Sequence, residues 1–373
     1  MGGKSLKIAV PIEWPAKLRE NDRTASLRFA MPKRAKEKPS EKRRRLFKLY
    51  SANAAIFAPE YSQYCPCPIC LSGFGERAIE ADTLLMDIAH VFPKSCGGNG
   101  GPKVLTCKQC NSRIGREYDS EFAYDSKLVA ALDGSGNGCV ATRIRLPGGT
   151  SIGTEFRKQN GGFRFDLIPK QTNPVERDRL IKSLRETGDL SFTMDLRTPD
   201  PKRYPVSLLH SAYLAMYRYF GFEYLVTGNS EWIRDILVRE DAPDDVPFFT
   251  LDVPKGCISV ARNDLLYTPF LATSESGLHA LAVAFPAANK EMETRIVLLP
   301  GFGKEAMHDY EKLRMGWENS QQRIGAIFEF HPLEPRLVDP KCQWFGNNLW
   351  RRLVAQSREP SSKARGIRME PSA

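Results

Sequence analysis

Two closely spaced pairs of cysteines place the strongest restriction on how this chain can fold. Cys67 and Cys70 form one C-x2-C pair, and Cys107 and Cys110 form a second after 36 intervening residues. Two such turns can present four sulfur atoms to one ion, which predicts a tetrahedral zinc site with Zn–S distances of about 2.3 Å. Four thiolate ligands leave no position for water or substrate, so we expect a structural zinc. The alternatives are a redox pair, which would need a thioredoxin-like βαβ pattern that is missing here, and a chance spacing.

The other cysteines of this region are expected to have lesser roles. Cys65 could replace Cys67 as a zinc ligand, but its separation from Cys70 fits the turn less well. Cys96 lies in a glycine-rich stretch and is interpreted as a bystander. Nine cysteines in 373 residues are too few for a disulfide scaffold.

Hydropathy argues against a membrane protein and against a secretion signal. No run approaches the roughly 20 apolar residues that cross a bilayer. The stretch before Pro11 contains only a short apolar run, unlike the core of a signal peptide. We therefore expect a cytoplasmic protein.

The net charge of +10 is concentrated near the two ends of the chain. Residues 1–60 hold 15 basic and 6 acidic side chains, whereas residues 61–130 hold 7 and 8. Because residues 31–48 contain few apolar side chains, we expect them to form an arm or an exposed helix. Such a charge run is ordinarily a solvated surface or an interaction tail. A polyanion is the partner that it would attract. The longest basic run is Lys42, Arg43, Arg44 and Arg45.

Local patterns predict four segments: a basic arm (1–60), a cysteine-containing domain (61–132), a mixed α+β domain (139–350) and a tail expected to be disordered (356–373). In the cysteine-containing domain, a strand-like run at 84–92, a glycine-rich turn and the segment 104–107 predict a β-hairpin. The spacing of apolar residues after Cys110 predicts a helix. Turn-forming residues at 133–138 mark the predicted end of this domain.

The third segment shows signals for a helix packed against a sheet. A helix is predicted from Asn173, with Pro174 in its first position, to the vicinity of Gly188. Residues 205–225 are apolar nearly all round, which predicts a buried helix. The predicted fold class is therefore α+β, a ββα finger with a four-cysteine zinc site followed by an α+β domain. Strands are predicted at 141–147 and 161–169, separated by a polar connection, and in one further sheet at 248–253, 257–261, 278–285 and 294–302.

Between the two cysteine pairs stands one histidine, His90. A lone histidine is more often structural than catalytic, but a longer pattern surrounds this one. The pattern combines H-x2-P-x-S-x-G-G with C-x2-C-N-S-x2-G, formed by His90, Pro93, Ser95, Gly97, Gly98, Cys107, Cys110, Asn111, Ser112 and Gly115. Over residues 65–125 the chain resembles the HNH endonuclease family, whose first histidine starts a ββα-metal finger.

The resemblance implies metal-dependent hydrolysis of DNA phosphodiesters. His90 would be the general base that activates water, and Asn111, in place of the final histidine of the motif, would hold or orient the catalytic Mg2+ or another divalent cation. That ion would polarise the scissile phosphate and stabilise the leaving 3′ oxygen. One finger contacts one strand, so a monomer would nick DNA and a double-strand break would need a homodimer or two events. Free-standing members imply antiviral defence or a mobile element as the setting.

The chain departs from the family pattern directly before this histidine. Many members carry an acidic metal ligand there, whereas this chain has Ala89. Asp87 lies on the same side of the predicted strand as Ala89 and could replace that ligand directly or through water. The alternative for Asp87 is a merely solvated carboxylate.

Beside such a motif, the basic run becomes a site for contacts to the phosphate backbone, with an affinity that falls steeply with salt. We therefore expect Lys42, Arg43, Arg44 and Arg45 to contact nucleic acid. Further phosphate contacts near the scissile bond are expected from Lys94, Lys108 and Arg113. No base-reading pattern accompanies these residues, so sequence specificity is not predicted.

Two other interpretations stay open. The chain could be a non-catalytic zinc-ribbon module that binds DNA or RNA, with a structural His90. Alternatively, the α+β domain could be the functional core and the finger a docking element. That domain is expected to sense a ligand, a regulatory partner or a form of DNA.

Overall fold

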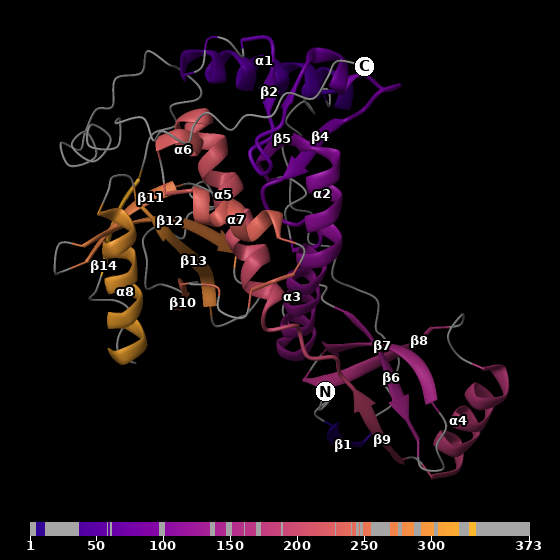
Figure 1. Ribbon diagram of the computed structural model, residues 1–373. Coiled ribbons are helices and arrows are strands. Elements are labelled where there is room, and N and C mark those ends of the chain that lie inside the picture. Colours follow the sequence, from indigo (N-terminus) through magenta and orange to yellow (C-terminus); the bar gives the residue numbers. More distant parts are fainter. Residues whose placement is uncertain are drawn as a thin grey trace, which may run out of the picture. The chain divides into compact units, whose positions relative to one another are not determined.

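The structure, a computed structural model, describes most of the chain between residues 37 and 332 and one strand near the N-terminus (Figure 1). The described residues are 5–11, 37–57, 59, 62–96, 101–134, 139–146, 151–159, 161–168, 173–187, 189–227, 229–239, 241–243, 246, 249–254, 269–274, 278–286, 292–301, 305–320 and 328–332. The predicted strand at 257–261, the predicted tail at 356–373 and much of the predicted arm lie outside them.

The chain divides into two compact units along lines other than the predicted domains. The small unit comprises Met1–Lys38 and Ala130–Thr198, and the large unit comprises Pro39–Val129 and Pro199–Ala373. The segment predicted as one α+β domain, 139–350, therefore contributes to both units. The predicted arm is also divided, because its first 38 residues and its last 22 fall in different units.

The small unit is an antiparallel sheet with one helix. Its strand order is β1-β9-β6-β7-β8. The predicted helix is confirmed as α4, and its start is fixed by Asn173, whose Oδ1 accepts a hydrogen bond of 3.0 Å from the Val175 N–H. The elements are β1 (Ser5–Pro11), β6 (Val140–Arg145), β7 (Ser151–Gln159), β8 (Gly162–Leu167), α4 (Pro174–Thr187) and β9 (Asp189–Asp195).

The polar connection predicted between 147 and 161 is wrong, because β7 fills most of it. Ile152, Thr154 and Phe156 are buried along this strand, and Ser151 and Glu155 are exposed. Threonine and serine hide the alternation when only apolar residues are counted, although threonine is a good strand former.

The large unit contains a three-layered part in which a sheet lies between helices (Figure 1). Its antiparallel strand order is β10-β13-β12-β11-β14. On β12, Leu281, Val283 and Phe285 join the core that includes α5, whereas the intervening alanines join the core that includes α8. Burial on both faces explains the nearly continuous apolar run of this strand. The elements are α5 (Arg203–Phe220), α6 (Phe222–Thr227), α7 (Glu231–Val238), β10 (Phe249–Pro254), β11 (Pro269–Ser274), β12 (His279–Pro286), β13 (Met292–Pro300), α8 (Ala306–Ser320) and β14 (Phe328–Pro332).

The predicted helix at 205–225 is buried as expected but is not continuous. It is divided at Gly221, which separates α5 from α6. Gly221 has a φ of 59°, a conformation that is costly for residues with a Cβ, and its N–H still donates to the Tyr217 carbonyl at 2.7 Å. A glycine at this point therefore ends the helix while the apolar pattern runs on.

The rest of the large unit is the cysteine-containing part. A short hairpin, a second hairpin and a helix follow one another, and α1 packs against them with its buried Leu46, Phe47, Tyr50 and Ala54. The Tyr50 ring stacks on Tyr217 of α5 at 4.6 Å between centroids. Residues 39–48 of the predicted arm are thus a packed helix. The elements are α1 (Pro39–Phe57), β2 (Cys65–Pro66), β3 (Gly73–Phe74), β4 (Met86–His90), β5 (Lys103–Cys107), α2 (Lys108–Ile114) and α3 (Ser120–Asp133).

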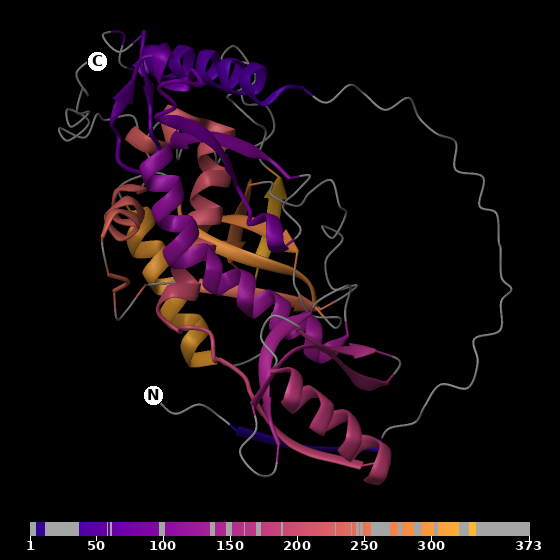
Figure 2. The ribbon, with the colours of Figure 1, turned by 90° about the vertical axis from the view of Figure 1, so that its right-hand side faces the viewer.

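A π-helical segment at Gly115–Asp119 joins α2 to α3, so that the two form one continuous rod (Figure 2). Asp119 at its end accepts a hydrogen bond of 2.8 Å from the Ser207 hydroxyl of α5. In the part of the chain that the structure describes, no helix combines the length and the apolar character needed to span a membrane.

Candidate metal centre and active site

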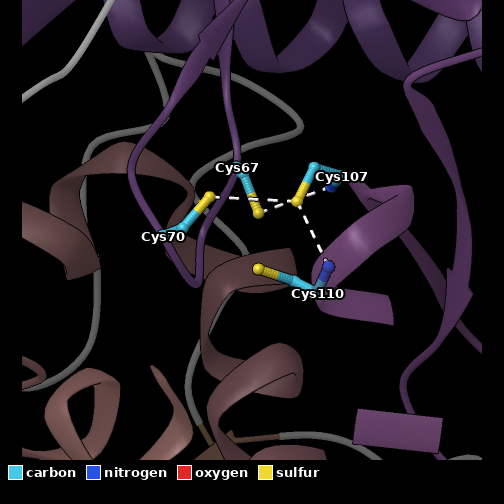
Figure 3. A group of neighbouring side chains, drawn as sticks. All are labelled: Cys67, Cys70, Cys107 and Cys110. Atoms are coloured by element: carbon cyan, nitrogen blue, oxygen red, sulfur yellow. Dashed lines mark hydrogen bonds between the residues drawn. The ribbon is translucent and has the colours of Figure 1, made fainter. Parts of the chain in front are cut away.

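The four predicted zinc ligands come together. The Sγ atoms of Cys67, Cys70, Cys107 and Cys110 all lie within 4.8 Å of one another, and they point toward a common centre (Figure 3). Sulfur atoms placed tetrahedrally about 2.3 Å from one ion would stand roughly 3.8 Å apart. Cys70 Sγ lies 3.8 Å from Cys107 Sγ. The donor set and its spacing therefore fit a tetrahedral ion such as zinc.

The first cysteine pair is held by a tight turn between β2 and β3. The Leu71 N–H donates to the Cys67 carbonyl at 2.9 Å, and the Cys67 N–H donates to the Ser72 carbonyl at 2.9 Å. In this turn Leu71 has a φ of 59°, a positive value that residues other than glycine rarely adopt. The Tyr213 hydroxyl of α5 donates to the Pro68 carbonyl, and this hydrogen bond ties the turn to α5.

The second pair comes from the junction of β5 and α2. Cys107 caps α2, and its Sγ accepts from the Cys110 N–H at 3.4 Å. The Cys107 N–H in turn donates to Cys67 Sγ at 3.4 Å. These N–H groups point at sulfur atoms, as expected where sulfur carries negative charge.

The neighbouring thiols shift one another's pKa values. Hydrogen bonds from Cys107, Cys110 and Cys67 lower the pKa of the Cys70 thiol, whereas burial is the main cause that raises the pKa of Cys67. A divalent cation would displace the thiol protons, because thiolates are the ligand form of cysteine.

The two remaining cysteines of this region stay outside the cluster, as the sequence predicts. Cys65 is fully buried, and its Sγ lies 3.9 Å from the Pro66 carbonyl oxygen. Cys96 lies 4.0 Å from the Phe122 carbonyl oxygen.

The ββα arrangement around His90 consists of β4, β5 and α2. The strands pair in antiparallel register, with His90 opposite Lys103 and Met86 opposite Cys107. His90 is the last residue of β4 and is partly exposed, and Asn111 lies on α2 with a partly exposed side chain. The cysteine cluster holds the end of β5 and the start of α2, so it fixes the hairpin to the helix that carries Asn111.

The residue before His90, Ala89, is buried and cannot ligate a metal ion. Ala89 is 2% exposed, so no solvent-facing carboxylate is available there. Asp87 is partly exposed, but its Oδ1 accepts from the Ile88 N–H at 2.8 Å and lies 3.4 Å from Arg43 Nη1. Strand alternation directs Asp87 and His90 to opposite faces of the hairpin. The predicted metal ligand Asp87 is thus engaged by a predicted nucleic-acid contact, Arg43.

The four residues of the basic run differ in their surroundings on α1. The side chain of Arg43 is only 13% exposed, and that of Arg44 is half exposed and lies 3.4 Å from Glu80. Lys42 is partly exposed and Arg45 is exposed. Arg45 and Arg44 are therefore the better placed of the four for contacts with a polyanion.

Of the three contacts predicted near the scissile bond, Arg113 has another use. Its guanidinium donates to the carbonyl of Leu237 and, at 2.7 Å, to that of Arg239, at the end of α7. Glu117 lies 3.6 Å from the same group. Lys94 and Lys108 are exposed. Sequence reasoning missed the role of Arg113 because its partners lie more than 120 residues away, with no local signal.

In a comparison with protein families, residues 67–126 match the model of a family described as HNH endonuclease. Neither a curated protein nor a solved structure matches the chain. The matched segment begins at the first cysteine of the cluster and contains β4, β5, α2 and both His90 and Asn111. Residues 67–126 therefore belong to the HNH endonuclease family.

Proposed function

We propose that the protein is a divalent-metal-dependent endonuclease that hydrolyses DNA phosphodiesters with His90 as the general base. The observation that carries the proposal is the place of His90, at the end of β4 in a ββα finger whose strand β5 and helix α2 supply two of the four clustered cysteines. Asn111 would hold or orient a catalytic Mg2+ or a similar ion. When bound, that ion would polarise the scissile phosphate. Zinc in the cysteine cluster would be structural.

The biological setting is proposed from the family alone. A monomer with one finger would nick one strand, and a homodimer would cut both. Antiviral defence or a mobile element is the proposed context, with DNA as the partner in the cytoplasm. A regulatory partner that binds through residues 139–350 is a further part of the proposal.

The test is cleavage of supercoiled plasmid by the full chain with Mg2+. We expect His90→Ala to abolish nicking while the zinc content stays the same. His308→Ala is the matched control, because His308 is exposed on α8 and away from the matched segment. Cleavage by His90→Ala at the parental rate would refute the proposed role.

A second candidate function is a non-catalytic zinc module that binds nucleic acid. The buried Ala89 and the engaged Asp87 favour it, because β4 then offers no unengaged carboxylate to a catalytic ion. This candidate predicts that the parental protein binds DNA with or without Mg2+ and never cleaves it.

A further inference from the structure

The sheet of the small unit has one apolar face and one charged face. On β6, the buried Val140, Thr142 and Ile144 alternate with the exposed Arg143 and Arg145. The same alternation continues on β7 and β9, where Phe156 and Phe192 are buried. Helix α4 contacts these two strands and contributes a buried Leu180. The apolar face is thus covered, and the opposite face is left to charged side chains.

Strand register gathers four arginines on that second face. Arg143 and Arg145 lie on β6, and the directly opposed Arg157 and Arg164 lie on β7 and β8. Arg143 is exposed, the side chains of Arg145 and Arg164 are 63% and 54% exposed, and that of Arg157 is 35% exposed. We call this set the arginine face. Among the side chains that the structure describes, three carboxylates share it: Glu155, Asp166 and Asp195.

Among the described side chains, the carboxylates of this face pair with only a few of the guanidinium N–H donors. Asp166 lies 3.1 Å from Arg157 and 2.9 Å from Arg164, so one carboxylate serves two arginines. Asp195 lies 2.7 Å from Arg145. Each guanidinium carries five N–H donors in a planar fork that suits phosphate as well as carboxylate. Exposed ion pairs are weak, at about 0.2–1 kcal/mol, so a phosphate can replace or share the carboxylate.

The net charge of the small unit also favours a polyanionic partner. By sequence, the small unit holds 21 basic and 12 acidic side chains, whereas the large unit, with the finger, holds 33 and 32. Nearly the whole excess of +10 therefore belongs to the unit without the cysteine cluster. A strongly cationic unit attracts polyanions and gives salt-dependent affinity.

We propose that the arginine face binds the phosphate backbone of duplex DNA, as an accessory surface separate from the finger. It carries no exposed aromatic side chain among its described residues on β6 and β7, so base stacking is not part of the interaction. The binding is accordingly independent of base sequence. It is a property of the small unit that does not require cleavage.

The experiment measures binding of the full chain to a short fluorescent duplex by anisotropy over a range of NaCl concentrations. All proteins carry His90→Ala, so that the probe stays intact. Arg143→Gln/Arg145→Gln removes two charges from the arginine face. We expect the affinity to fall about 10-fold, and the slope of log Kd against log salt to decrease by about 2.

The matched control removes the same charge from the covered side of the same unit. Arg177→Gln/Arg179→Gln changes two arginines of α4 that are 48% and 70% exposed and also lie beside carboxylates. We expect this pair to leave affinity and salt slope unchanged. Arg143→Lys/Arg145→Lys keeps the charge and should bind within about 3-fold of the parent. Affinity lost in the glutamine pair but kept in the lysine pair would trace the loss to charge on this face.

If the glutamine variants of β6 and of α4 lose the same affinity, the effect depends only on net charge. If neither variant loses affinity, the arginine face does not take part in binding. Either result overturns the proposal. Plasmid cleavage is scored separately. If the parent never cleaves but the β6 pair loses affinity, the nuclease assignment fails and the arginine face stands.

Discussion

Arg43 Nη1 of α1 lies 3.4 Å from Asp87 Oδ1 of β4, 44 positions further along the chain. The Arg43 side chain is only 13% exposed, and that of Asp87 is 36% exposed. The contact explains why the basic run is not a detached arm: one of its charges fastens α1 to the finger. Because Asp87 Oδ1 is already paired with Arg43, this oxygen is not available as an unengaged metal ligand.

The first prediction separates docking from DNA contact within the basic run. Arg43→Ala should lower the free energy of unfolding by about 1 kcal/mol, because it removes a partly buried ion pair and a side chain that is only 13% exposed. Arg45→Ala, at an exposed position of the same helix, should leave stability unchanged and weaken DNA binding. Urea denaturation and anisotropy measure the two effects. Equal stability of both variants would show that the contact with Asp87 holds nothing in place.

The second prediction concerns the cysteine cluster. Cys110→Ser should reduce bound zinc from about one ion per chain to almost none and should unfold the finger, because binding and folding of such sites are coupled. Cys96→Ser is the control, since Cys96 lies outside the cluster. Cys65→Ala tests the alternative ligand and should retain zinc. Atomic emission after dialysis measures the metal, and zinc in Cys110→Ser at the parental level would contradict the assignment.

Local patterns predicted those parts of the molecule that depend on neighbouring residues. The cysteine spacing, the hairpin at 84–107 and the start of α4 at Asn173 each rest on a few adjacent positions. The contact of Arg43 with Asp87 and the pairing of β1 with β9 join distant segments, for which short-range periodicity carries no signal. Two elements differ from the prediction because packing or backbone conformation outweighed the apolar pattern. Thr154 is buried on β7, a strand that the pattern did not predict, and Gly221 divides the predicted helix by its positive φ.

The third prediction tests whether Arg113 is a clamp or a phosphate contact. Arg113→Lys keeps the charge, but an ammonium cannot reproduce the fork that reaches the carbonyls of Leu237 and Arg239. We expect a loss of about 2 kcal/mol in stability with little change in DNA affinity. Lys108→Ala, on the exposed first position of α2, should show the reverse. Parental stability in Arg113→Lys would return this residue to the set of phosphate contacts.

The fourth prediction uses the strained turn of the first cysteine pair. At Leu71 the φ of 59° costs any L-residue about 1–2 kcal/mol, whereas glycine adopts it freely. Both Leu71→Gly and Leu71→Ala lose the contacts of the leucine side chain with the core, so their difference isolates the backbone. The glycine variant should therefore be about 1 kcal/mol more stable than the alanine variant, the opposite of the usual order. Thermal unfolding of the zinc-loaded proteins measures this difference. An alanine variant as stable as the glycine variant would mean that the turn between Cys70 and Ser72 relaxes to a negative φ in solution.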